Sequence, residues 1–172
     1  DMKTAIVNIG QILSGNWRYP IKTGNSILLD GELISKVGEL TEPETQDSDI
    51  IIDAGGAIAA PGLIDSHVHI TFGDFTPRQN MVGYLQSYLH GGVTTSISAS
   101  EVHVPGRPTD PDGVKALAVA ARKCFENFKP SGMRVYAGSL ILEPGLTSKD
   151  YEDVVSKGVW LAKAGFGAVS KA

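Results

Sequence analysis

The stretch that decides the fold of this chain is PGLIDSHVHI, Pro61 to Ile70. It is an apolar strand that ends in two histidines at alternate positions, His67 and His69. Because alternate residues of a strand point to the same side, the two imidazoles are expected to project together. An isolated H-x-H is more often a pair of core histidines held by hydrogen bonds. Its place after PGLID, at the end of a strand, instead favours half of a metal site, because imidazole binds zinc, iron, nickel and manganese.

The composition is that of a soluble globular protein. The chain has 172 residues, 42% of them hydrophobic and 20% charged, with a net charge of -4. This length allows a sizeable core, and the absence of a basic run argues against a nucleic-acid partner. The single cysteine, Cys124, cannot form an internal disulfide, which fits a reducing compartment such as the cytoplasm. No segment resembles a membrane span or a signal peptide, so no membrane partner is expected.

Residues 1–56 predict a small β domain. Segment 3–9 is rich in β-branched residues, and segment 26–38 holds an Asp-Gly turn between two apolar runs, which is a hairpin signal. Segment 41–49 is expected to be a polar loop, and segment 50–56 a further strand that ends in glycines.

Residues 57–172 predict repeated strand–helix units of an α/β fold. Buried strands covered by helices indicate a parallel sheet, either doubly wound or closed as a (β/α)8 barrel. The first strand lacks a following GxGxxG and carries the histidine pair instead, which favours the barrel. The third helix has Thr147 as its N-cap and Asp150 as the capping-box partner. Strands are expected at 59–70, 92–100, 133–142 and 158–165, and helices at about 77–89, 111–128 and 148–157.

The motif APGLIDSHVH, placed after a β-rich segment, resembles the amidohydrolase superfamily of metal-dependent hydrolases. The stretches SHVHITFGDFTPRQ, LHGGVTTSISA, PGRP and LILEPGLT resemble its ring-opening hydrolases of cyclic amides. The resemblance covers essentially the whole chain. It implies the N-terminal half of a (β/α)8 TIM-type barrel, strands 1 to 4, preceded by part of a small β-sandwich. The chain is therefore expected to be a fragment, completed by the remainder of its own polypeptide or by a second chain.

The resemblance also implies a site with two divalent metal ions, either zinc alone or zinc plus iron. His67 and His69 would bind the more buried ion. A bridging acidic ligand is implied at the end of the fourth strand, where Lys163 stands instead of the glutamate of the cyclic-amide hydrolases. A neutral lysine amine can combine with carbon dioxide to form an anionic carbamate. The alternatives are Lys171 as the bridging residue, or a Lys163 whose stem packs on the barrel and whose amine reaches solvent.

The implied reaction is metal-assisted hydrolysis of the C–N bond of a small cyclic amide. Two further histidines and a proton-transfer aspartate are expected beyond Ala172. Family resemblance suggests a homo-oligomer. The alternatives are another amidohydrolase specificity, for an imidazolone, a hydantoin or a dipeptide, and a non-catalytic scaffold with the same fold.

Four other side chains are candidates for the site or its surroundings. His103 is expected to contact substrate or to be an exposed loop histidine. Arg107 is expected to bind a substrate carboxylate through its planar fork, or to anchor its loop by a salt bridge. Asp65 is expected to orient a ligand or to solvate the mouth of the site. Cys124, in the second helix, is expected to be a packed core thiol.

Overall fold

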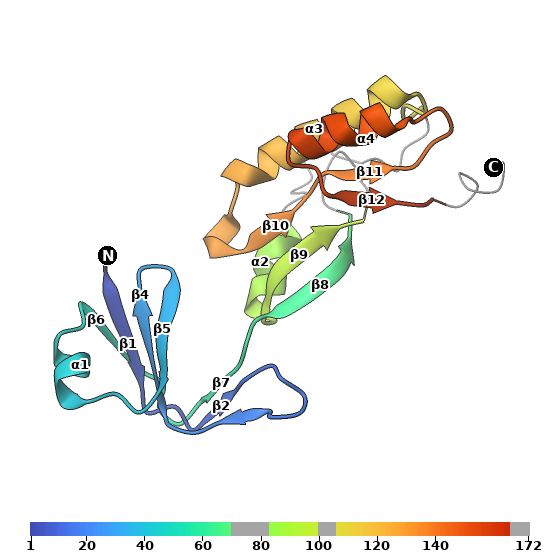
Figure 1. Ribbon diagram of the computed structural model, residues 1–172. Coiled ribbons are helices and arrows are strands. Elements are labelled where there is room, and N and C mark those ends of the chain that lie inside the picture. The colour runs from blue at the N-terminus through green and yellow to red at the C-terminus, as the bar shows by residue number, and fades with distance from the viewer. Residues whose placement is uncertain (70–82, 100–105, 166–172) are drawn as a thin grey trace. The chain divides into compact units, whose positions relative to one another are not determined.

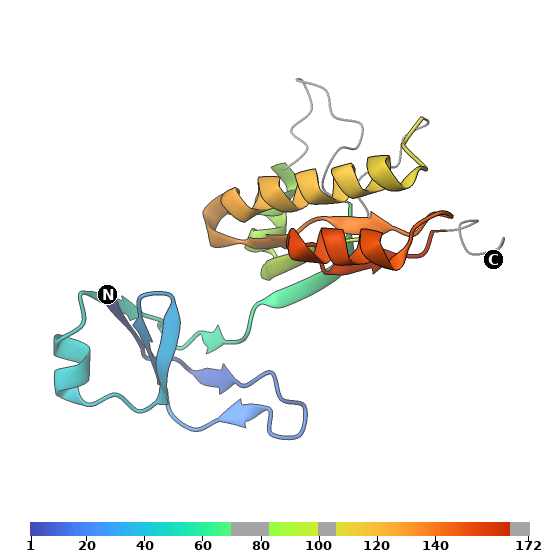
Figure 2. The same ribbon diagram turned by 45° about the horizontal axis from the view of Figure 1, so that its top comes forward.

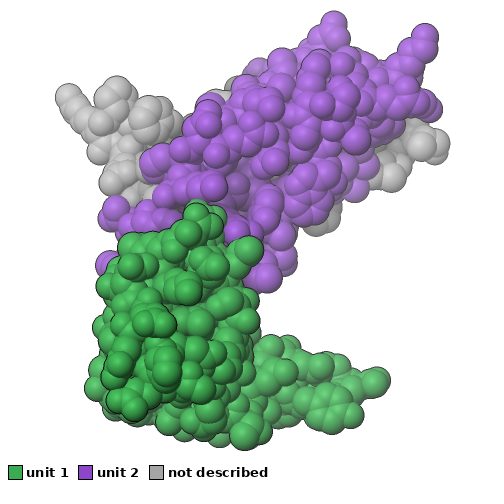
Figure 3. Space-filling model, turned by 60° about the vertical axis from the view of Figure 1, so that its left-hand side comes forward, with its two compact units in different colours: residues 1–61 green, residues 62–172 purple. Residues whose placement is uncertain are grey.

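The computed structural model describes residues 1–69, 83–99 and 106–165. The chain divides into two compact units, Asp1–Pro61 and Gly62–Ala172, which are called unit 1 and unit 2 below (Figure 3). Unit 1 extends beyond residue 56, the boundary expected from the sequence. The reason is that strand β7, Ile58–Ala59, pairs with strand β2, Gln11–Leu13.

Unit 1 contains a four-stranded sheet of order β5-β4-β1-β6 and a three-stranded sheet of order β3-β2-β7. In the larger sheet β1 is antiparallel to β4 and parallel to β6, and β4 forms a hairpin with β5. The hairpin expected around Asp30 and Gly31 is therefore confirmed. The bounds not yet given are β1 Lys3–Val7, β3 Ile21–Lys22, β4 Ser26–Asp30, β5 Leu33–Gly38 and β6 Ile50–Asp53.

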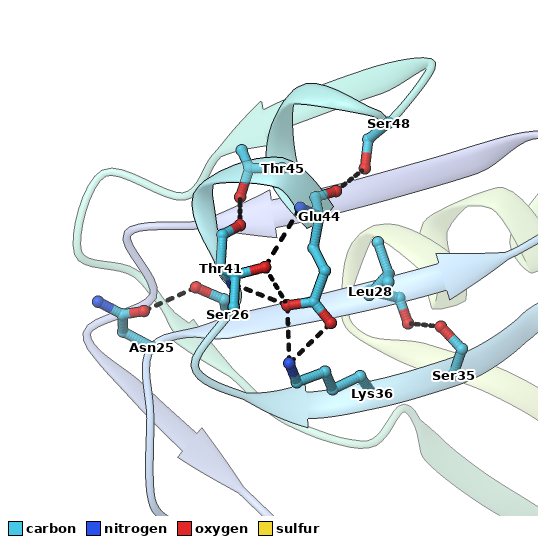
Figure 4. A network of polar contacts seen from close by, with 9 residues as sticks. All are labelled: Asn25, Ser26, Leu28, Ser35, Lys36, Thr41, Glu44, Thr45 and Ser48. Atoms are coloured by element: carbon cyan, nitrogen blue, oxygen red, sulfur yellow. Dashed lines mark hydrogen bonds and ion pairs between the residues drawn. The ribbon is translucent and has the colours of Figure 1, made fainter.

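The polar segment 41–49 is not only a loop, because it contains helix α1, Glu42–Gln46. Thr41 and Glu44 form a capping box in which the Thr41 N–H donates to the Glu44 carboxylate at 2.7 Å (Figure 4). The Lys36 ammonium also contacts that carboxylate at 2.7 Å. The hydrogen bond from Lys36, and then those from Thr41, lower the pKa of Glu44 to about 2. The T-x-x-E spacing carried this signal in the sequence.

The described part of unit 2 has five short parallel strands in two sheets. β8, β9 and β10 form a sheet of order β10-β9-β8, and β11 pairs with β12. The parallel pairing that the strand–helix repeats predicted is confirmed. The bounds are β8 Leu63–Val68, β9 Val93–Ser98, β10 Arg134–Tyr136, β11 Ser139–Ile141 and β12 Leu161–Lys163.

The third expected strand, 133–142, is broken into β10 and β11 at Gly138. This residue has a φ of +94°, a conformation that L side chains rarely adopt. A Cβ at this position would lie 2.7 Å from the Ala118 carbonyl oxygen and 2.7 Å from the Arg122 Cβ. The close approach of the neighbouring helix thus requires glycine here. The break lets one segment pair with two different strands.

The helices of unit 2 are α2 Gly83–His90, α3 Pro111–Asn127 and α4 Ser148–Ser156, with a 3-10 turn at Pro130–Gly132. The α3 and α4 helices lie side by side (Figure 1, Figure 2). The predicted capping box of α4 is confirmed, since the Thr147 N–H donates to Asp150 at 2.8 Å. Lys115 of α3 reaches Asp150 at 2.7 Å and, with Thr147, holds the pKa of that carboxyl far below its usual range. None of the described helices combines the length and the apolar character that crossing a bilayer requires.

Among the residues of unit 2 that the structure describes, buried side chains form two core clusters. One lies between the larger sheet and helices α2 and α3, and the other joins α3, α4 and β11. Cys124 belongs to neither cluster and is exposed, so the prediction that it is a packed core thiol is wrong. The buried line of α3 runs through positions 114, 118, 121 and 125, and position 124 lies off it. The clusters are Val68, Leu85, Ala121, Phe125, Met133, Val135 and Ala137, and Val114, Ala118, Leu140, Val154 and Val159.

Candidate metal and active site

The two histidines of the opening motif project together from the end of β8. The ring centroids of His67 and His69 lie 5.2 Å apart, with an angle of 79° between the ring planes. Both residues are exposed, whereas Val68 between them is 5% exposed and belongs to the core. The alternation of the strand therefore gives the arrangement that the sequence predicted, with the imidazoles on the side away from the core.

The pairing of β8 with β9 is irregular just where the histidines begin. Asp65 faces Ser96 and Val68 faces Ser98, so three steps along β8 match two along β9. Inside this irregularity the His67 backbone N–H donates to the Asp65 carboxylate at 3.0 Å. Asp65 is thereby turned toward the backbone of the first histidine.

A hollow of about 320 Å³ lies at the carboxyl ends of β8, β9 and β12, and His67 and Lys163 both line it. Lys163 is the last residue of β12 and is half-buried. Its carbonyl oxygen accepts from the Leu142 N–H at 2.9 Å, which holds the end of the strand in place. The carboxyl ends of parallel strands are where α/β enzymes hold their active sites. The full lining is Ser66, His67, Ile97, Ser98, Ala99, Ser139, Leu161, Ala162, Lys163 and Ala164.

The donor set suits a metal ion only in part. Two imidazoles from one strand could provide two nitrogen ligands, and Lys163 could provide an anionic oxygen if it were carboxylated. Within the described ranges, no group of three or more His, Cys, Asp or Glu side chains converges as a metal site. The described residues thus offer a metal ion two imidazoles and a lysine that needs carboxylation, which is fewer ligands than a complete site has.

Of the remaining candidate site residues, Arg107 is held by contacts with other residues, and the others lie outside the described residues. Arg107 forms an ion pair with Glu143 and donates to the Pro108 carbonyl oxygen at 3.2 Å. This is the loop-anchoring arrangement considered from the sequence. His103 and Lys171 lie outside the described residues.

Sequence reasoning missed the serines that surround the hollow. Ser98 and Ser139 are 1% and 4% exposed and belong to its lining. Nearby on β9, Ser96 is fully buried, and its hydroxyl has no hydrogen-bond partner among the described residues. The available signal was the polar residues of TTSIS, at positions 94–98, in a predicted strand of a parallel sheet where apolar residues would be expected.

Comparison with solved structures points to the class of protein. No family model matches the sequence. The chain superposes on enamidase, a structure described as a member of the amidohydrolase superfamily, with a TM-score of 0.82 and 44% identity. That match covers 94% of this chain and 42% of the other. A triazine hydrolase at 16% identity and a TM-score of 0.57 shares the fold alone.

Along nearly the whole of this chain, the sequence is similar to the enamidase of Eubacterium barkeri. The two are 42% identical over 168 residues, which is 97% of this chain and 44% of the relative. The imidazolonepropionase of an Arthrobacter species is 31% identical over 102 residues, 58% of this chain and 24% of that protein. The chain spans less than half the length of these relatives. The resemblance that the motifs predicted is confirmed.

Proposed function

We propose that this chain is part of a metal-dependent amidohydrolase that opens a cyclic amide of the 6-oxo-1,4,5,6-tetrahydronicotinate type. The observation that carries the proposal is the hollow that His67 and Lys163 share at the ends of β8 and β12. The 42% identity to an enamidase supports this choice of substrate class.

In this proposal unit 2 supplies the first half of a (β/α)8 barrel, and unit 1 supplies part of a β-sandwich. The parallel pairing of β8, β9 and β10 supports the barrel. Leu63 and Ile64 on β8 are 60% and 66% exposed, although parallel sheets are normally covered on both faces. Further strands of the same protein, or of a second chain, would cover these side chains.

The roles of the site residues follow from their donor atoms. His67 and His69 would hold the more buried of two divalent ions, zinc or zinc plus iron, and Lys163 would bridge the two as a carbamate. When bound, the metals would activate water and polarise the amide carbonyl. The other histidines and the aspartate that moves the proton would lie outside these 172 residues.

The bonds made and broken define the products. One water adds to the ring carbonyl and the C–N bond breaks, which leaves a carboxylate and an enamine. A second water hydrolyses the enamine, which releases ammonia and leaves an aldehyde acid. The small, partly polar hollow would take the substrate, with His103 as a proposed further contact. We also propose a homo-oligomer in the cytoplasm.

The test is turnover by the full-length protein, followed as ammonia released from 6-oxo-1,4,5,6-tetrahydronicotinate. We expect turnover in the wild type and in His90→Ala, and its loss in His67→Ala. A folded, metal-loaded protein that leaves this substrate intact would contradict the proposal. Turnover of 4-imidazolone-5-propanoate instead would support the second candidate, which the 31% identity to an imidazolonepropionase favours. A scaffold would turn over neither compound.

A further inference from the structure

The structure assigns a positioning role to Asp65: its carboxylate holds the backbone of His67, and thereby fixes the direction in which the two imidazoles project. The inference rests on the proposed function in one respect, since the rings are taken to hold a metal. Asp65 itself is not required as a ligand. Its contact is with the His67 backbone N–H, at 3.0 Å.

The irregular pairing explains why the backbone needs this support. Between the pairs Asp65–Ser96 and Val68–Ser98, β8 contains one residue more than β9. An extra residue of this kind leaves a backbone group without its partner in the ladder. The regular pattern resumes at Val68, whose carbonyl oxygen accepts from the Ala99 N–H at 2.8 Å. The His67 N–H falls inside the irregular part, and Asp65 provides its acceptor.

The direction of the histidine side chains depends on this local arrangement. A shift of one residue in a strand moves every side chain to the opposite face. In this strand such a shift would turn His67 and His69 into the core and bring Val68, now 5% exposed, to the surface. An aspartate whose carboxylate accepts a hydrogen bond from the backbone N–H two residues later closes a local turn. Such a turn stabilises one backbone conformation. The Asp65 contact thus selects the arrangement in which both rings lie on the side of the strand away from the core.

The role of Asp65 depends on its acceptor oxygen and not on its negative charge, and substitutions can separate the two. Asparagine keeps an oxygen at the same place and can accept the same hydrogen bond, whereas alanine cannot. Unit 1 offers a matched control, because Asp53 accepts from the Gly55 N–H at 2.8 Å through the same spacing of two residues. Removing that contact loses an equivalent turn in unit 1, whereas the histidines belong to unit 2.

The experiment compares full-length wild type, Asp65→Ala, Asp65→Asn and Asp53→Ala. Zinc affinity is measured by competition with a chelator, and hydrogen exchange of the His67 amide is measured on the metal-free protein. We expect Asp65→Ala to bind zinc about 10- to 100-fold more weakly, as for other losses of groups that orient ligands. Its His67 amide should exchange faster. Asp65→Asn should remain near wild type in both measurements, and Asp53→Ala should keep its zinc affinity.

Two results would overturn the inference. One is an Asp65→Asn variant as impaired as Asp65→Ala, because charge rather than the hydrogen bond would then matter. The other is an Asp65→Ala variant with unchanged zinc affinity, while His67→Ala loses zinc and so upholds the proposed function. If the wild type binds no zinc, the proposed function fails. In that case the hydrogen-exchange rate of the His67 amide still tests the role of Asp65. An unchanged rate in Asp65→Ala would refute that role.

Discussion

His67, near the end of β8, and Lys163, at the end of β12, line the same hollow although they come from the first and last strands of unit 2. An imidazole can bind a metal ion as it stands, whereas a lysine amine would become an anionic ligand only after carboxylation. Both lie at the carboxyl ends of parallel strands, where α/β enzymes hold their active sites.

Replacement of Lys163 should change how the site acquires metal. We expect metal loading of the wild type to depend on bicarbonate, because the carbamate carbon comes from carbon dioxide. In Lys163→Glu the carboxylate is already present, so loading should not depend on bicarbonate, while Lys163→Ala should lose most of the metal. The measurement is metal content after reconstitution with and without bicarbonate.

Labelling distinguishes Lys163 from Lys171. With 13C-bicarbonate, a carbamate signal should appear in the NMR spectrum of the wild type and of Lys171→Arg, and be absent from Lys163→Arg. A signal that survives in Lys163→Arg and disappears in Lys171→Arg would transfer the bridging role to the rival position.

Adjacent valines on α4 test the packing of the second core cluster. Val154 is 2% exposed and Val155 is 61% exposed. Val154→Ala should lower the free energy of unfolding by about 2 kcal/mol, because it removes two buried methyl groups and leaves a small cavity. Val155→Ala makes the same chemical change in the same helix and should cost roughly nothing. Equal effects in urea unfolding would show that α4 does not pack as described.

Gly138→Ala should destabilise unit 2 more than Gly132→Ala, a substitution at another glycine of positive φ. Gly132 has a φ of +82° and open space around its Cβ position, so it reports backbone strain alone. That strain is worth about 1 kcal/mol. Gly138 adds the contact with Ala118 and Arg122, so its substitution should cost more than that in thermal unfolding. Similar losses for the two variants would show that α3 does not lie against the β10–β11 break.

The capping box of α1 predicts a pH dependence of unit 1. The pKa of Glu44 falls on folding from 4.5 to about 2, so the ionised form is favoured in the folded state. The stabilisation is present above about pH 4.5 and is lost as the pH falls toward 2. Wild type and Glu44→Gln should therefore differ in stability at pH 6 and converge in acid. The exposed Glu39→Gln should show a much smaller difference, and parallel curves for Glu44→Gln would contradict the ion pair.

Local patterns predicted much of the fold. The Asp30-Gly31 turn, the capping box of Thr147 and Asp150, and the helix expected at about 111–128 each depend on residues close in the sequence. The break at Gly138 was not predictable, because it results from contact with Ala118 and Arg122 of a different element. The exposure of Cys124 was not predictable for a similar reason. Several neighbouring positions of a helix could face the core, and only the packing shows which of them are buried.

The candidate site was predictable where one strand determines it. Alternation alone places His67 and His69 on one side, and the structure agrees. The hydrogen bond of Asp65 was not predictable, because it depends on the register of β8 against β9. The contact of Arg107 with Glu143 likewise joins two loops that periodicity does not connect.

The most direct test of the central claim is the metal content of the full-length protein, in the wild type and in His67→Ala. We predict about two divalent ions per chain in the wild type and a loss of most of this metal in His67→Ala. His90→Ala, which alters a histidine at the end of α2, should keep the wild-type content, and circular dichroism should show all three proteins folded. A folded His67→Ala that retains its full metal content would contradict the account.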